Sequence, residues 1–332
     1  MQDRYAGDIG DYGKIGLLKC LQHHGFTIGV NWYRVPILDV EKNADGSFKQ
    51  EDGRYLIPDG IAGCDPSLAN VLNKIAKQKK RSVLEIEKAD LLTDAVFYNK
   101  YLTVEGRDKW HKQALKALKD VDLVFLDPDN GLLVKSVGKK SARSVKYAFY
   151  EEVRDYIESG KSVLIYNHRS RKQEKDYFDS IDEQIQEKVR VYQYVIQKIT
   201  FPKGTVRDYF AIPACKEHYR KICEAFADMK RSQWGQLGVC RLYPEWADDL
   251  DIEYKTYDDQ AFVNTECERF DENISFDEYK NDIIRYLTLS SWRYTEKQAV
   301  AIVDREMEYI KECFANRETV AETAVEIGYG CG

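Results

Sequence analysis

The first 212 residues alternate between short apolar runs and longer segments with helical spacing. Two of the apolar runs, 121–126 and 162–166, are hydrophobic almost throughout, which is typical of strands covered on both faces of a parallel sheet. Strands are predicted at residues 27–35, 82–86, 121–126, 162–166, 189–200 and 206–212. Helices are predicted at residues 14–24, 107–119, 147–159 and 173–187, with a further helix that starts at Pro66.

This alternation of strands and helices predicts an α/β fold. The last two predicted strands flank the turn Pro202–Lys203–Gly204, so we expect them to form an antiparallel hairpin. Residues 1–240 are therefore predicted to form a Rossmann-like, doubly wound, mostly parallel sheet with an antiparallel hairpin at one edge.

The remainder of the chain has a different character. Residues 241–275 are acidic and irregular and are predicted to be a connector. Helices are predicted at 276–290, 295–313 and 317–327, so that residues 276–332 form a small all-α unit. Roughly 55 residues are few for independent stability. We therefore expect these acidic helices to dock on the α/β body or on a protein partner.

Charge is divided unevenly along the chain. From Glu245 onward there are 22 acidic and 9 basic residues, whereas residues 1–244 carry 41 basic and 34 acidic residues. A basic body suits an anionic ligand such as a nucleotide or nucleic acid, although the same charges can simply solvate a surface. No segment approaches the roughly 18 apolar residues that span a bilayer, the N-terminus lacks a signal-peptide layout, and the eight cysteines form no C-x-x-C pair. We expect a soluble, cytoplasmic protein with free thiols and no membrane contact.

Polar residues follow the two most apolar strands. Asp127, Pro128, Asp129, Asn130 and Gly131 come directly after the first, and His168 ends the second. Because ligands bind beyond the carboxyl ends of strands in an open parallel sheet, we predict a catalytic site that contains Asp127, Pro128, Asp129, Asn130 and His168. Ordinary turn chemistry would also explain this loop, but such a turn needs fewer acids.

Basic residues flank this predicted site on two loops. Residues 135–146 contain five basic residues and no acid, among them Lys139, Lys140 and Arg143. Arg169 and Arg171 follow the second strand. These five named residues are predicted to contact substrate phosphate, with a solvated surface as the alternative.

A second candidate site precedes the first helix. Gly7, Asp8, Gly10, Asp11 and Lys14 lie within eight residues, and glycines before a helix allow backbone N–H groups to meet a ligand. The spacing matches no Walker loop, and no strand precedes it as in a dinucleotide fingerprint. Because the acids favour hydroxyls, amines or a metal over phosphate, we predict that these five residues bind a cofactor.

Both candidate sites resemble parts of one family. The layout Y-A-G-D-x-G-D-x-x-K at residues 5–14, followed by a Leu-rich helix, is similar to the start of the J-type bacterial 23S ribosomal RNA adenine-N6 methyltransferases. The run VFLDP at residues 124–128 resembles the strand and acceptor loop of D-P-P-Y amino-methyltransferases, and the predicted hairpin fits the antiparallel end of their sheet. The runs GDIGDYGK and FLDPDNGL are also similar to those of further bacterial proteins, a likeness that implies no activity.

The resemblance implies S-adenosylmethionine-dependent methylation of an amino group of a nucleotide or nucleic acid. It implies that Asp127 and the carbonyl of Pro128 accept hydrogen bonds from that amine. Two features depart from the family. Asp129 and Asn130 replace the second proline and the stacking aromatic residue, and residues 31–36 after the first strand lack the family's acid-x-Gly-x-Gly turn for the methyl donor.

These departures keep two other hypotheses open. A divalent-metal-dependent hydrolase or nuclease would hold Mg²⁺ or Mn²⁺ with Asp127 and Asp129 and move protons with His168. A degenerate, non-catalytic module would instead bind nucleic acid or a protein.

Overall fold

The chain divides into two compact units, each with a hydrophobic core of its own. The computed structural model describes residues 2–36, 56–79, 81–169, 172–191, 194–243, 270–289 and 296–329. The first unit comprises Met1–Val191 and Ile196–Asp249, and the second comprises Tyr192–Val195 and Leu250–Gly332.

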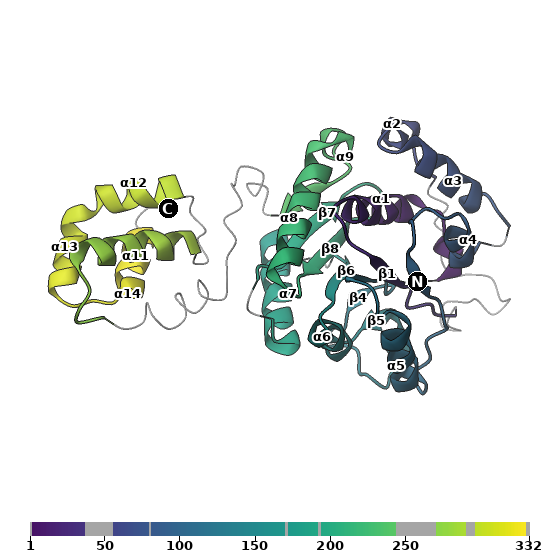
Figure 1. The fold of residues 1–332 in the computed structure, drawn as a ribbon, viewed down its shortest axis with the longest axis horizontal. Coiled ribbons are helices and arrows are strands. Elements are labelled where there is room, and N and C mark those ends of the chain that lie inside the picture. Colours follow the sequence, from purple (N-terminus) through teal and green to yellow (C-terminus); the bar gives the residue numbers. More distant parts are fainter. Residues whose placement is uncertain are drawn as a thin grey trace. The chain divides into compact units, whose positions relative to one another are not determined.

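One mixed sheet organises the first unit (Figure 1). In the described residues the strand order is β2-β1-β3-β6-β8-β7-β9. The strands are β1 (Ile28–Asn31), β2 (Val96–Tyr98), β3 (Leu123–Leu126), β6 (Ser162–His168), β7 (Gln197–Phe201), β8 (Arg207–Ile212) and β9 (Arg241–Tyr243). Strands β2, β1, β3 and β6 pair in parallel, and the β6–β8, β8–β7 and β7–β9 pairs are antiparallel. The predicted mostly parallel α/β sheet with an antiparallel edge is confirmed.

Helices cover both faces of this sheet. They are α1 (Ile9–His23), α2 (Asp59–Ala62), α3 (Pro66–Ala76), α4 (Val83–Lys88), α5 (Arg107–Ala117), α6 (Tyr150–Glu158), α7 (Glu174–Val189), α8 (Lys216–Arg231) and α9 (Gln233–Gln236), with 3-10 turns at η1 (Asp3–Tyr5) and η3 (Ala142–Lys146). Residues of α1, α3 and α8 share one core cluster, and residues of α5, α6 and α7 share the other. A second, two-stranded parallel pair joins β4 (Gly131–Leu132) to β5 (Tyr147–Ala148).

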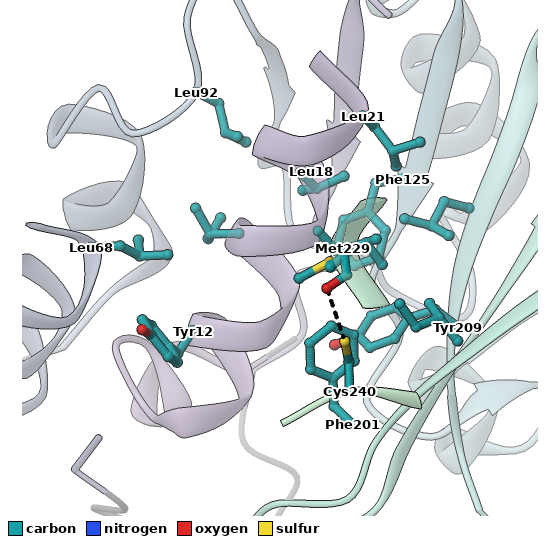
Figure 2. Packing of buried hydrophobic residues seen from close by; sticks show 14 of the residues in the cluster. Tyr12, Leu18, Leu21, Leu68, Leu92, Phe125, Phe201, Tyr209, Met229 and Cys240 are labelled. Carbon is teal, nitrogen blue, oxygen red and sulfur yellow. Dashed lines mark hydrogen bonds between the residues drawn. The ribbon is translucent and has the colours of Figure 1, made fainter. Parts of the chain in front are cut away.

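Helix α1 packs closely on the sheet and on α9 because it presents small residues to both. Leu18 and Leu21 lie in one buried cluster with Phe125 of β3 (Figure 2). A Cβ atom added at Gly13 would be 2.6 Å from the ring of Phe201, and one at Gly16 would be 2.5 Å from the ring of Trp234. These glycines therefore have a packing role, which the sequence pattern alone did not indicate.

One predicted strand is wrong. Residues 82–86 were expected to be extended, but the chain forms helix α4 there. The Ser82 side chain accepts from the backbone N–H of Leu84 as an N-cap, and Asp3 Oδ1 accepts from the N–H of Val83 at 3.1 Å. These capping contacts favour a helix. The apolar run is too short for its periodicity to distinguish a helix from a strand. The neighbour of β1 is instead β2, which the sequence did not predict.

Other boundaries moved by several residues. The strand predicted at 27–35 ends at Asn31 in β1. The strand predicted at 189–200 is shorter at its start: α7 continues to Val189, and β7 begins at Gln197. The predicted connector 241–275 begins with strand β9. Its residues 244–269 lie outside the described residues.

The second unit is helical. It contains α11 (Phe276–Leu289), α12 (Glu296–Arg305), α13 (Met307–Ala315) and α14 (Val320–Tyr329). Tyr279, Ile283 and Ile310 are among the residues of its core. The single helix predicted at 295–313 is two helices, α12 and α13. Among the described residues of both units, no helix is long and apolar enough to cross a membrane.

Candidate functional site

The Gly/Asp run at the N-terminus folds as a capped helix start. Asp8 is the N-cap of α1, and its Oδ1 accepts from the N–H groups of Gly10 at 2.7 Å and Asp11 at 3.2 Å. Gly7 has a φ of 86° and would bring an added Cβ within 2.7 Å of the Leu72 carbonyl oxygen. Its N–H donates to Asp11 Oδ2 at 2.7 Å. The N–H groups of Gly7, Gly10 and Asp11 are therefore bound by side chains of the same run, not exposed for an anion.

Lys14 joins the two predicted sites. Its Nζ lies 2.8 Å from Asp11 Oδ1 and 2.7 Å from Asp127 Oδ2. Lys14, Asp11 and Asp127 are 5%, 1% and 3% exposed. Charges buried to this extent are tolerated only when paired and hydrogen-bonded. The N-terminal run and the 127–131 loop, predicted separately, thus meet in one ion-paired cluster.

Burial and neighbouring charges set the protonation of this cluster. Burial raises the pKa of Asp127, and the Lys14 ammonium opposes that rise. Burial alone would lower the pKa of Lys14, but the carboxylates of Asp11 and Asp127 raise it well above its ordinary value, so Lys14 stays charged. Burial, together with the nearby Asp11 carboxylate, raises the pKa of Asp8 to about 6. Asp8 can therefore change its charge near neutral pH.

The 127–131 loop is held on both sides by backbone hydrogen bonds. Asp127 N–H donates to the Asn31 carbonyl at 3.0 Å, and Asn130 N–H donates to the Lys146 carbonyl at 2.9 Å. Asp129 is 3.7 Å from Lys146 Nζ. Because Asn130 is bound to Lys146, the basic segment 135–146 is anchored directly beside the loop.

Asn167 braces the end of the same loop. A Cβ atom added at Gly131, whose φ is 97°, would lie 1.9 Å from Asn167 Oδ1. That oxygen accepts from Leu132 N–H at 2.8 Å, and Asn167 Nδ2 donates to Tyr177 at 2.6 Å. Only glycine fits position 131, because it combines a left-handed φ with close contact. Asn167 therefore shapes the loop.

His168 lies next to this loop. Its backbone N–H donates to the Asn130 carbonyl at 3.4 Å, and the residue is exposed. The expectation that the strands ending at Asp127 and His168 are neighbours is correct, because β3 pairs with β6. Burial of part of the ring and the Arg207 guanidinium lower the pKa of His168. The imidazole is therefore biased toward its neutral form.

The residues predicted to bind phosphate fall into three groups: one in an ion-pair network, three exposed, and one outside the described residues. Arg169 is engaged in an ion-pair network, since its Nε donates to Asp208 at 2.8 Å and its other nitrogens contact Glu174 and Thr200. Lys139, Lys140 and Arg143 are exposed on the segment between β4 and β5, with Lys139 2.6 Å from Glu151. Arg171 lies outside the described residues.

The structure adds residues to the cluster that the sequence did not indicate. Tyr166 of β6 and Tyr209 of β8 are cross-strand partners, and burial raises the pKa of both. Tyr209 is fully buried, and its hydroxyl has no hydrogen-bond partner in the part of the chain that the structure describes. Arg207 lies two residues before Tyr209, so both side chains lie on the same face of β8. Arg207, Asp208 and Tyr209 are consecutive in the sequence, so no alternation of polar residues marked this face of the strand.

No family model, curated protein or solved structure matches the chain. Any assignment of function therefore depends on the geometry of the site.

The turn after β1 differs from the glycine turn of the resembled methyltransferases. Trp32 and Tyr33 are fully buried there, and Tyr33 has a φ of 44°. Trp32 N–H donates to the Tyr98 carbonyl at 3.3 Å, and Tyr33 N–H donates to Asn31 Oδ1 at 3.3 Å. The amides that a glycine turn would offer to a ligand are thus bound within the protein. This turn does not fit a methyl donor.

The carboxylates proposed as metal ligands have cationic partners. Asp127 is bound to Lys14, and Asp129 lies near Lys146. Among the described residues, no group of three His, Cys, Asp or Glu side chains is arranged to hold a metal ion.

Proposed function

We propose that the chain is a methyltransferase-like enzyme that acts on an amino group of a nucleotide or nucleic acid. One observation carries the proposal: the Asp127–Pro128 turn follows β3, between β1 and β6, and Asp127 is tied by Lys14 to the capped start of α1. In open parallel sheets, ligands bind beyond the carboxyl ends of the strands, where this turn lies. A donor held beside α1 and an amine held at Asp127 would therefore be neighbours.

The acceptor side of the proposal rests on Asp127. The Asp127 side chain acts purely as a hydrogen-bond acceptor when it is ionised, because the protonated form also carries an O–H donor. Lys14 favours that ionised form against the effect of burial. The Pro128 ring fixes the backbone of the turn, so its carbonyl can serve as a second acceptor. In this account Asp127 and Pro128 orient the substrate amine.

S-adenosylmethionine would supply the methyl group. The turn after β1 does not fit it, but the chemistry at the start of α1 suits a cationic ligand. Asp8, Asp11 and Asp127 provide three carboxylates there, beside the cations Lys14 and Arg207. We expect Asp8 and Tyr209, whose hydroxyl has no hydrogen-bond partner among the described residues, to hold the donor. We also propose a cytoplasmic location, which cell fractionation would test.

A second candidate is a non-catalytic module that binds nucleotide or nucleic acid. The buried Trp32 and Tyr33 favour it, because they close the turn at which related folds hold the donor. The two candidates differ in one respect. Only the enzyme should transfer a methyl group.

The test is methyl transfer from radiolabelled S-adenosylmethionine to pooled RNA, DNA and nucleotides. Wild-type protein should label one of these pools, and Asp127→Asn should reduce the rate on the order of a hundredfold because it replaces a preorganised charged acceptor with a neutral amide. Asp120→Asn, at an exposed carboxylate, is the matched control and should retain the rate. If wild-type protein labels none of the pools yet is stabilised by nucleotides, the binding module is the correct reading.

A further inference from the structure

The outer end of the β6–β8 pair brings two basic side chains together. His168, the last residue of β6, is the cross-strand partner of Arg207, the first residue of β8. When His168 is protonated, it and Arg207 are like charges directly opposite each other, which destabilises a sheet. Such a pair is favoured when an anion lies between the two side chains.

Arg207 is held in position by its surroundings. A Cβ atom added at Gly10 would lie 2.6 Å from Arg207 Nε, so the absence of a side chain at Gly10 makes room for the guanidinium at the start of α1. Arg207 Nη1 donates to the Thr205 carbonyl at 2.8 Å. Its contact with Asp8 is long, because Asp8 Oδ2 lies 3.9 Å from Arg207 Nη2, which is beyond hydrogen-bonding distance. Arg207 therefore has donor capacity left for a ligand.

His168 is accessible, and few acids act on it within the part of the chain that the structure describes. Its ring is exposed, and the Tyr166 hydroxyl lies 3.5 Å from its Nδ1. Asp208 is the one acid that raises its pKa, against the larger lowering by burial and Arg207. Asp208 is itself bound by Arg169. Asp208 therefore competes little with an anion beside His168 and Arg207.

We propose that His168 and Arg207 form an oxyanion subsite that binds a phosphate group of the ligand. This subsite takes the role that the sequence assigned to Arg169, which is instead part of an internal ion-pair network. Tyr166 is level with Asp127, one step beyond the Leu126–Ile165 pair, and His168 lies two residues, roughly 7 Å, further along the strand. A nucleotide could span this separation. The inference rests on the proposed function only in taking the ligand to be a nucleotide or nucleic acid.

The direct test follows the His168 ring by NMR while inorganic phosphate is added at constant ionic strength. A bound phosphate should raise the pKa of His168, because an anion stabilises the imidazolium form. The signal of His23, which is exposed in the last turn of α1, provides an internal reference and should not respond to phosphate. An unchanged His168 titration with phosphate, a nucleoside monophosphate and a short oligonucleotide would overturn the inference.

Variants separate a binding role from a structural one. Arg207→Gln should weaken phosphate binding roughly tenfold or more, since it removes a charge-assisted hydrogen bond. Arg207→Lys should retain part of the binding and guards against misfolding of the first variant. Arg220→Gln, at an exposed arginine of α8, is the matched control. Equal weakening by Arg220→Gln would mean a diffuse charge effect and would also contradict the subsite.

The three phosphate ligands also identify the source of the group. A response to the nucleotide but not to the oligonucleotide would indicate a free nucleotide, and the reverse would indicate a strand backbone. Neither measurement includes a methyl donor. Phosphate binding without methyl transfer would therefore refute the proposed function alone. Methyl transfer that is unaffected by Arg207→Gln, with no response of His168, would refute the subsite alone.

Discussion

Lys14 is the residue on which the site cluster depends most. Its ammonium is bound by Asp11 and Asp127, all three being buried. Lys14→Met should destabilise the α/β unit by about 3–5 kcal/mol, because it leaves two buried carboxylates without a cation. Urea denaturation followed by circular dichroism would measure the change.

A double variant serves as the control for that prediction. Lys14→Met combined with Asp127→Asn should recover part of the lost stability, because one uncompensated charge is then absent. If Lys14→Met alone cost no more than an exposed lysine substitution such as Lys112→Met, the ion-paired cluster would not exist as described.

Asp8 gives the site a pH dependence with a defined sign. Its pKa is about 6, above the ordinary value of 3.8, so the folded protein binds the proton more tightly than the unfolded chain. This contribution to stability is fully present below about pH 4 and is lost as the pH rises through about 6, by an order-of-magnitude figure of about 3 kcal/mol. Asp8→Asn keeps a capping oxygen. It should flatten this slope and exceed the wild-type stability at pH 7.

Asp122→Asn is a control of opposite sign. Although burial raises the pKa of Asp122, hydrogen bonds from Thr27 hold it below its ordinary value, so its contribution is lost on acidification. Thermal melts between about pH 2 and pH 7 would compare the two variants, because the Asp122 contribution is lost only below about pH 4. An Asp8→Asn variant with the wild-type slope would show that Asp8 is not the titrating group.

At the scale of elements, the contact of α1 with the sheet depends on glycine. Gly13→Ala would force a Cβ atom to 2.6 Å from the Phe201 ring, and overpacking of this kind typically costs about 1–3 kcal/mol. Gly60→Ala in α2 is the matched control, because nothing lies within 4 Å of its added Cβ. It should be neutral or stabilising by up to about 1 kcal/mol. Equal effects of both changes on the melting temperature would contradict this packing role.

The elements also show what the sequence could predict. Strands β3 and β6 were predicted because they are apolar throughout, and their ends located Asp127 and His168. The segment 82–86 was mispredicted, because its state is decided by Asp3 and Ser82, contacts that the local pattern does not contain. Strand β2 is only three residues long and partly exposed, so its hydrophobic pattern was too weak to recognise.

Among the site residues, too, those in a local cluster were predicted and those brought together by distant contacts were not. Asp127 and the Gly/Asp run were found because each is a dense local cluster of polar residues. The Lys14–Asp127 contact joins residues 113 positions apart, and Arg207 and Tyr209 reach the cluster from β8. Such long-range partners have no local signature in a single sequence. The packing role of Gly13 and Gly16 is likewise defined by Phe201 and Trp234.

At the scale of the whole molecule, the two units should unfold separately. Each has its own core, and cooperativity requires a shared one. Scanning calorimetry should show two transitions. Ile283→Ala should lower only the transition of the helical unit, and Leu164→Ala only that of the α/β unit, each being fully buried in its own core. One transition lowered by both variants would contradict this division.

We propose that the carboxyl ends of the strands around Asp127 form the site of a methyltransferase-like enzyme. Calorimetric titration of the full chain with S-adenosylmethionine tests it most directly. We expect saturable heat of binding, weakened by Asp8→Asn and accompanied by a rise in melting temperature. The absence of both heat and stabilisation, in protein that still binds a nucleotide, would contradict it.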